Sequence, residues 1–225
     1  MYDFLTSVEL YLFLKGPMVW IAFIIFIGGS ILRIGSLLYR AKKARVIYPY
    51  LNLRYSIRSI VHWIIPFAST NMRKRPWMTL ITFLFHLCLI LCPIFLLAHI
   101  MLWNDSWNIR WWALPEGAAD AATLIVILCG LFFVMRRLIA DEVRSVTSAS
   151  DFVILGIALA PYITGYLAFH QYLFEYDMII TLHILFGELL LIMIPFTRLS
   201  HMFLFWFTRA YTGSEFGEVR HSKDY

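Results

Sequence analysis

Five long runs of apolar residues, separated by shorter polar stretches, dominate this 225-residue sequence. They cover about 17–39, 77–103, 118–139, 152–174 and 178–207. A helix needs about 20 mostly apolar residues to cross the hydrocarbon core of a bilayer. The pattern therefore predicts an all-α integral membrane protein, a bundle of five transmembrane helices forming a single membrane domain over residues 1–225.

One polar stretch, about 40–76, is long enough to hold a helix of its own. Within it, a segment of about 47–70 places Arg54 and Arg58 on one helical face and a set of apolar residues on another, namely Ile57, Ile60, Val61, Ile64 and Ile65. This spacing predicts an amphipathic helix that lies in the membrane interface.

The composition agrees with a membrane protein, since 61% of the residues are apolar and 15% are charged. Soluble domains have roughly 45–50% and about 25%. Seventeen of the 19 Lys and Arg residues fall on one side of the predicted bundle, and only Lys15 and Arg110 fall on the other. The positive-inside rule then predicts an outer N-terminus and a cytoplasmic C-terminus in a multi-pass membrane protein. Because the basic residues flank apolar runs, no nucleic-acid partner is expected. Cys88, Cys92 and Cys129 lack metal-binding spacing and are interpreted as small buried apolar residues.

Four histidines lie within the second and fifth predicted helices, which run in opposite directions. His86 and His99 are 13 residues apart, about 20 Å along a helix, and His183 and His201 are 18 residues apart, about 27 Å. The helices therefore offer one histidine each at two depths, His99 with His183 on the outer side and His86 with His201 on the inner side. On an ideal helix His183 and His201 share one face, whereas His86 and His99 differ by about 140° unless Pro93 bends the helix between them. This arrangement predicts two b-type haems, each ligated by two imidazoles.

Other residues leave alternatives open. Each histidine taken alone is more often a hydrogen-bonding group in a helix bundle than a ligand. His62 could replace His86, and His170 could replace His99. Glu188 is an intramembrane carboxylate in the fifth helix, and it could accept a proton from a quinol or be a neutral group hydrogen-bonded to a neighbouring helix.

With these positions in hand, the chain resembles the di-haem cytochrome b family of the gamma subunit of membrane-bound nitrate reductase. The resemblance rests on FHLCLILCPIFLLAH, with His86 and His99, and on HILFGELLLIMIPFTRLSH, with His183 and His201. The segments RKRPWMTL, PYITGYLA, PFTRLSHM and GSEFGEVR look closer still to the b-type membrane subunits (HmcE-like) of the high-molecular-weight cytochrome c transmembrane redox complexes of sulfate-reducing bacteria. That resemblance implies a place in the bacterial cytoplasmic (inner) membrane, with a periplasmic multihaem cytochrome c, other integral subunits and a cytoplasmic iron–sulfur protein as partners. It also implies electron exchange with menaquinone or directly across the membrane, in anaerobic respiration.

These observations predict an electron-transfer subunit of an oxidoreductase complex. Electrons would pass through two bis-His haems between a quinol or periplasmic cytochrome and a cytoplasmic acceptor. The alternative is a haem-free integral scaffold subunit, in which the histidines only form hydrogen bonds. An enzyme acting alone is not expected, because no catalytic domain fits outside the membrane.

Overall fold

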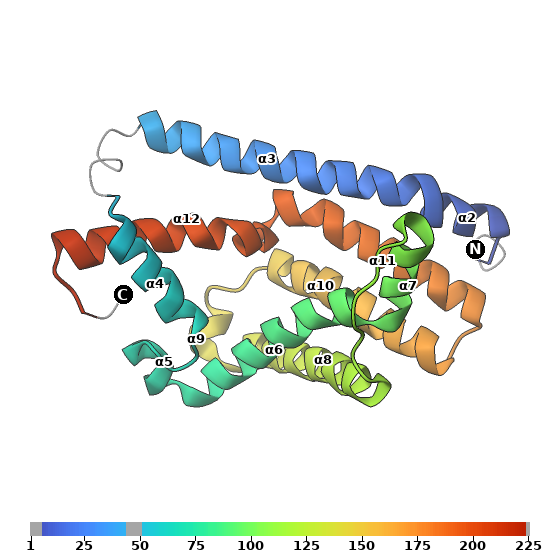
Figure 1. Ribbon diagram of the computed structural model, residues 1–225. Coiled ribbons are helices and arrows are strands. Elements are labelled where there is room, and N and C mark those ends of the chain that lie inside the picture. Colours follow the sequence, from blue (N-terminus) through green and yellow to red (C-terminus); the bar gives the residue numbers. More distant parts are fainter. Residues whose placement is uncertain (1–5, 44–50, 224–225) are drawn as a thin grey trace. The chain divides into compact units, whose positions relative to one another are not determined.

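The computed structural model describes residues 6–43 and 51–223, which form helices and no strands (Figure 1). Five helical stretches are long and apolar enough to cross a membrane: Val8–Lys43, Pro76–Trp107, Glu116–Ile139, Ala149–His170 and Tyr176–Phe196. The last three are the helices α8, α10 and α11. The prediction of an all-α chain with five membrane-spanning helices is therefore confirmed in number and type.

The first span begins earlier than the apolar run predicts. It contains α2 (Val8–Phe13), the π-helical turn η1 (Leu14–Met18) and α3 (Val19–Lys43). Pro17 falls inside η1 and not at a helix start. Proline has no N–H to donate, and a wider π turn is one of the ways in which a helix accommodates it.

The fifth span ends at Phe196 and not near residue 207. A short 3-10 helix, η3 (Arg198–Ser200), follows it, and α12 (His201–Ser214) begins after that. Pro195 lies in the last turn of α11, and the Thr197 hydroxyl caps the new helix by accepting from the backbone N–H of Leu199 at 3.2 Å. His201 thus belongs to a separate helix, so the same-face relation calculated for His183 and His201 on one straight helix does not apply.

The second span is also interrupted. Helix α6 (Pro76–Phe95) and helix α7 (Leu97–Trp107) meet at Leu96, whose backbone is extended with φ −70° and ψ 129°. Pro93 lies inside α6, three residues before the break. His86 and His99 are therefore on different helices.

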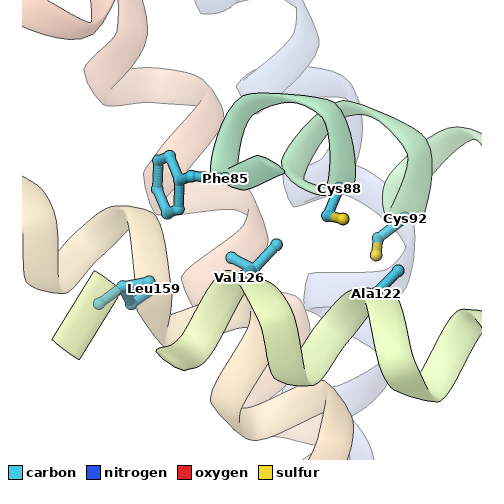
Figure 2. Close-up of a cluster of buried hydrophobic side chains, with 6 residues drawn as sticks. All are labelled: Phe85, Cys88, Cys92, Ala122, Val126 and Leu159. Carbon is cyan, nitrogen blue, oxygen red and sulfur yellow. The ribbon is translucent and has the colours of Figure 1, made fainter. Parts of the chain in front are cut away.

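The chain divides into two compact units, which are described separately. Unit 1 combines Met1–Lys15 with Ile81–Gly187, and unit 2 combines Gly16–Leu80 with Glu188–Tyr225. Figure 2 shows the core of unit 1, where α6, α8 and α10 contribute one cluster of buried side chains: Phe85, Cys88, Cys92, Ala122, Val126 and Leu159. The Cys92 sulfur lies 3.7 Å from the Thr123 hydroxyl. Cys88 and Cys92 are thus buried core residues, as the sequence predicted, and Cys129 packs beside them.

A buried carboxylate joins α8 to α10 at one end of unit 1. Asp151 is 8% exposed, and one of its oxygens lies 3.6 Å from the Arg137 guanidinium. Its other oxygen accepts from the backbone N–H of Ser148 at 2.9 Å, which completes a capping box at the start of α10. The two helix ends are thereby held together.

Unit 2 contains the amphipathic segment as α4 (Leu53–Ile64), followed by α5 (Thr70–Lys74). The predicted start of that segment, 47–50, lies outside the described residues, as does Arg45. Helix α4 packs on α12 through small polar residues: the Ser56 hydroxyl is 3.0 Å from that of Ser214, and the Arg209 guanidinium donates to Ser59 at 2.8 Å. The apolar residues of α4, including Ile57 (52% exposed), face away from this contact. An exposed apolar face is what a helix in the membrane interface requires.

Candidate functional site

The structure brings two of the predicted site residues side by side in unit 1. His99 from α7 and His183 from α11 have ring centroids 6.0 Å apart and ring planes within 13° of parallel. Both side chains are half-buried. The two imidazoles therefore lie close together with nearly parallel ring planes.

Each of these rings is held by a backbone carbonyl. His99 Nδ1 donates to the Pro93 carbonyl at 3.0 Å, and His183 Nδ1 donates to the Pro161 carbonyl at 2.9 Å. With the proton on Nδ1, the lone pair of the neutral ring is on Nε2. Metal-ligating histidines in proteins usually have this second-nitrogen hydrogen bond, which fixes the tautomer and the ring orientation.

The break at Leu96 places His99. Because the chain is extended there, the carbonyls of residues 93, 94 and 95 lose the helical N–H donors they would otherwise have. Each finds another donor: His99 Nδ1 for Pro93, Trp111 Nε1 for Ile94 at 2.9 Å, and the Leu114 N–H for Phe95 at 2.9 Å. In a membrane such carbonyls must be satisfied within the protein. The imidazole of His99 is thus part of the structure that makes the break possible.

A further residue, which the sequence did not single out, completes this arrangement. Pro93 has no N–H, so the carbonyl of Leu89 one turn earlier has no helical donor. The hydroxyl of Tyr162 on α10 donates to it at 2.6 Å. A proline in a membrane helix predicts such a free carbonyl, but it does not predict which residue of another helix will reach it.

Gly165 on α10 leaves room for the ring of His183. A Cβ atom at this position would lie 2.9 Å from Cε1 and 3.0 Å from Nδ1 of that ring. Glycine is therefore the residue that lets the imidazole lie directly against the backbone of α10.

The separation of the pair fits a haem iron between the two rings. A bond of about 2 Å from metal to nitrogen, plus about 1 Å from nitrogen to ring centre on each side, gives centroids roughly 6 Å apart. The measured 6.0 Å meets this requirement, and so does the Nδ1-protonated tautomer. Within the described residues, no group of three or more His, Cys, Asp or Glu side chains could hold a bare metal ion. A haem iron takes only two protein ligands, as this pair offers.

The other two predicted ligands, His86 and His201, belong to different units. In unit 1, His86 on α6 donates from Nδ1 to the Thr82 carbonyl at 2.8 Å. In unit 2, His201 at the start of α12 donates from Nδ1 to the Arg198 carbonyl at 2.8 Å. Both side chains are exposed, and both have the Nδ1-protonated tautomer of His99 and His183. Their assignment to one haem stays a prediction.

The two reserve histidines differ from one another. His170, at the end of α10, has its Nε2 2.9 Å from a carboxylate oxygen of Asp120 on α8, so this nitrogen faces a carboxylate. This position disfavours His170 as a haem ligand in place of His99. His62 lies on α4 in unit 2, half-buried, and its part in an inner site stays a prediction.

Glu188 is buried in α11, with 4% of its surface exposed. Among the residues that the structure describes, neither of its carboxylate oxygens has a hydrogen-bond partner. The prediction of a carboxylate inside a spanning helix is thus met, whereas a hydrogen bond from a neighbouring helix is not found within the described part of the chain. A buried carboxyl group without a partner is most stable in its neutral, protonated form.

Comparison with known proteins finds a relative that aligns over most of the chain. The chain is 36% identical over 218 residues to a protein of Nitratidesulfovibrio vulgaris (strain Hildenborough), described only as "Protein", and the alignment covers 94% of this chain and 95% of that one. No family model matches the chain, and no solved structure matches it.

Proposed function

We propose, from the premise that this chain belongs to the same protein family as its Nitratidesulfovibrio vulgaris relative, that it is a cytochrome b subunit of a membrane redox complex. In this role it binds a b-type haem between His99 and His183.

One observation carries the proposal, namely the close and nearly parallel imidazoles of His99 and His183. Their separation of 6.0 Å, their nearly parallel planes and their two Nδ1 hydrogen bonds together match what an iron with two axial imidazoles requires. When bound, the haem supplies one-electron redox chemistry. The chain's own residues hold the ligands in orientation, exclude water with apolar helices and tune the potential through the backbone carbonyls.

The remaining parts of the proposal extend it across the membrane. His86 and His201 are the ligands of a second, inner haem, and their Nδ1 hydrogen bonds to backbone carbonyls support that role. The distribution of Lys and Arg supports an outer N-terminus and a cytoplasmic C-terminus in the bacterial inner membrane. Electrons then pass between an outer donor, either a quinol or a periplasmic multihaem cytochrome c, and a cytoplasmic iron–sulfur partner, with other integral subunits beside this one. Glu188 is the candidate to accept a proton if menaquinol is the donor.

The rival function is a haem-free scaffold subunit of the same kind of complex. A directly packed aromatic pair has centroids about 4.5–7 Å apart, so the observed 6.0 Å also suits two stacked imidazoles with no iron between them. In that case the hydrogen bonds to Pro93 and Pro161 would only satisfy carbonyls near two helix prolines.

A count of haem in the purified protein distinguishes the two functions. We expect a reducible low-spin b-type spectrum and two haems per chain by pyridine haemochrome assay. His99→Ala and His183→Ala should each remove one haem, the same one, whereas His62→Ala should retain both. If the parent protein held one haem per chain, and both His99→Ala and His183→Ala lost it, only the outer site would be supported. Well-folded protein without a reducible b-type spectrum would refute the proposal and favour the scaffold.

A further inference from the structure

His170 and Asp120 form a histidine–carboxylate pair in unit 1 that is separate from the imidazoles of His99 and His183. The Nε2 atom of His170 approaches the Oδ2 atom of Asp120 at 2.9 Å, although outside the angle of a hydrogen bond. The two side chains come from the end of α10 and the first turns of α8. Their distance is that of an ion pair once the imidazole carries a second proton.

Three aromatic rings enclose the imidazole of His170. Tyr166 has its ring centroid 4.4 Å away, Phe169 5.1 Å away, and Tyr172 stacks on it at 5.4 Å with an interplanar angle of 16°. The side chains of His170 and Asp120 are still 23% and 32% exposed. The Nε2 atom of His170 is thus shielded from solvent, while the Asp120 carboxylate beside it is partly exposed and can exchange protons with water.

The pair is close to the predicted haem site along a single helix. Gly165, against which the ring of His183 lies, precedes His170 by five positions on α10. Five residues of helix correspond to about 7.5 Å along the axis. At roughly 10 Å and an effective dielectric constant of about 20, one unit of charge changes the proton affinity of a group by about tenfold.

We propose that His170 and Asp120 form a proton-binding site that is coupled to the redox state of the His99–His183 site. This inference rests on the proposed function. When a one-electron donor converts the ferric iron to the ferrous state, the site gains one negative charge. A proton from water then binds the lone pair of the neutral His170 ring, and the resulting imidazolium pairs with the carboxylate of Asp120.

The other charged residues near this end of unit 1 do not replace His170 as the partner of Asp120. Glu116 lies one turn earlier on α8, Glu175 and Asp177 lie around the start of α11, and Arg110 lies in the segment between α7 and α8. Among the residues described by the structure, no Lys or Arg forms an ion pair with Asp120, so His170 is the cation that this carboxylate can obtain.

Redox titration at several pH values tests the inference. By linkage, a proton bound more tightly in the reduced state makes the midpoint potential of the outer haem fall as pH rises. We expect this dependence in the parent protein, its loss in His170→Gln and a weaker dependence in Asp120→Asn. The control His221→Gln, in the polar segment that follows α12, should retain the parent's behaviour. Haem content and thermal unfolding identify any variant that fails to fold.

A second measurement reads the proton directly. Selective ¹⁵N-histidine NMR, with His170→Gln to identify the signal, should show the His170 ring more protonated in reduced than in oxidised protein at one pH. A potential independent of pH in the parent, or an unchanged dependence in both variants, would overturn this inference while leaving haem binding intact. Protein that binds no haem would instead refute the proposed function from which it starts.

Discussion

The contact between Gly165 and His183 allows a sharp test of how the site is built. In Gly165→Ala the new Cβ would lie 2.9 Å from the Cε1 atom of His183. Relaxed carbon contacts are about 3.5 Å, so the ring would have to retreat by roughly 0.5 Å. The hydrogen bond from Nδ1 to the Pro161 carbonyl, now 2.9 Å, would lengthen to about 3.4 Å, beyond the usual range of about 2.7–3.2 Å.

The expected loss of stability follows from that hydrogen bond. A buried polar group left without its partner costs about 1–3 kcal/mol. Replacing glycine by alanine inside a helix returns about 0.5–1 kcal/mol through the lower entropy of the unfolded chain. The free energy of unfolding should therefore fall by about 1 kcal/mol, and the affinity for haem should fall as well because a ligand is displaced.

Gly156 on the same helix is the matched control, since a Cβ atom there has nothing within 4 Å. Gly156→Ala should leave haem content unchanged and should raise the midpoint of thermal unfolding. Thermal unfolding in one detergent, with haem counted in the same samples, measures both effects. If Gly165→Ala were as stable as Gly156→Ala and bound haem equally well, the close packing of His183 on α10 would be wrong.

Two further substitutions test the packing around the site and in unit 2. Tyr162→Phe should destabilise the protein by about 1–3 kcal/mol, because the carbonyl of Leu89 loses its donor. Adding Pro93→Ala should recover part of that loss by restoring a helical N–H. Thermal unfolding measures both effects, and an absence of recovery would contradict the role assigned to Tyr162. Gly213→Ala should destabilise the contact between α4 and α12 by more than about 2 kcal/mol, because its Cβ would lie 2.5 Å from α4, whereas Gly35→Ala, with open space around it, should not. Limited proteolysis measures this second effect, and equal resistance of both variants to cleavage would count against the packing described.

The spans were predictable from sequence because their length and apolar content follow from the thickness of a bilayer. The breaks at Leu96 and after Phe196 were not. Pro93 and Pro195 both lie inside helices, so the position of a proline does not give the residue at which a helix ends. The break at Leu96 depends on donors supplied by Trp111 and Leu114, which lie beyond the next helix.

The candidate site, too, was predictable from the sequence only in part. The proximity of His99 and His183 could be anticipated from their depths in antiparallel helices, and the structure places the rings together. Their function as ligands stays a prediction. The proximity of His170 to Asp120 could not be anticipated, because it depends on how the ends of α8 and α10 meet in space.

The break at Leu96 has a consequence for how this protein can vary. Loops at a membrane surface usually tolerate insertions and deletions. The 108–115 segment is different, because Trp111 and Leu114 donate hydrogen bonds to carbonyls that the break leaves without helical donors. The same break leaves the Pro93 carbonyl free to accept from His99. Adding one residue there would pull two anchors out of register and shift an imidazole on the neighbouring helix. Sequence drift in this segment is therefore expected to preserve its length and the indole of Trp111 while its other residues change.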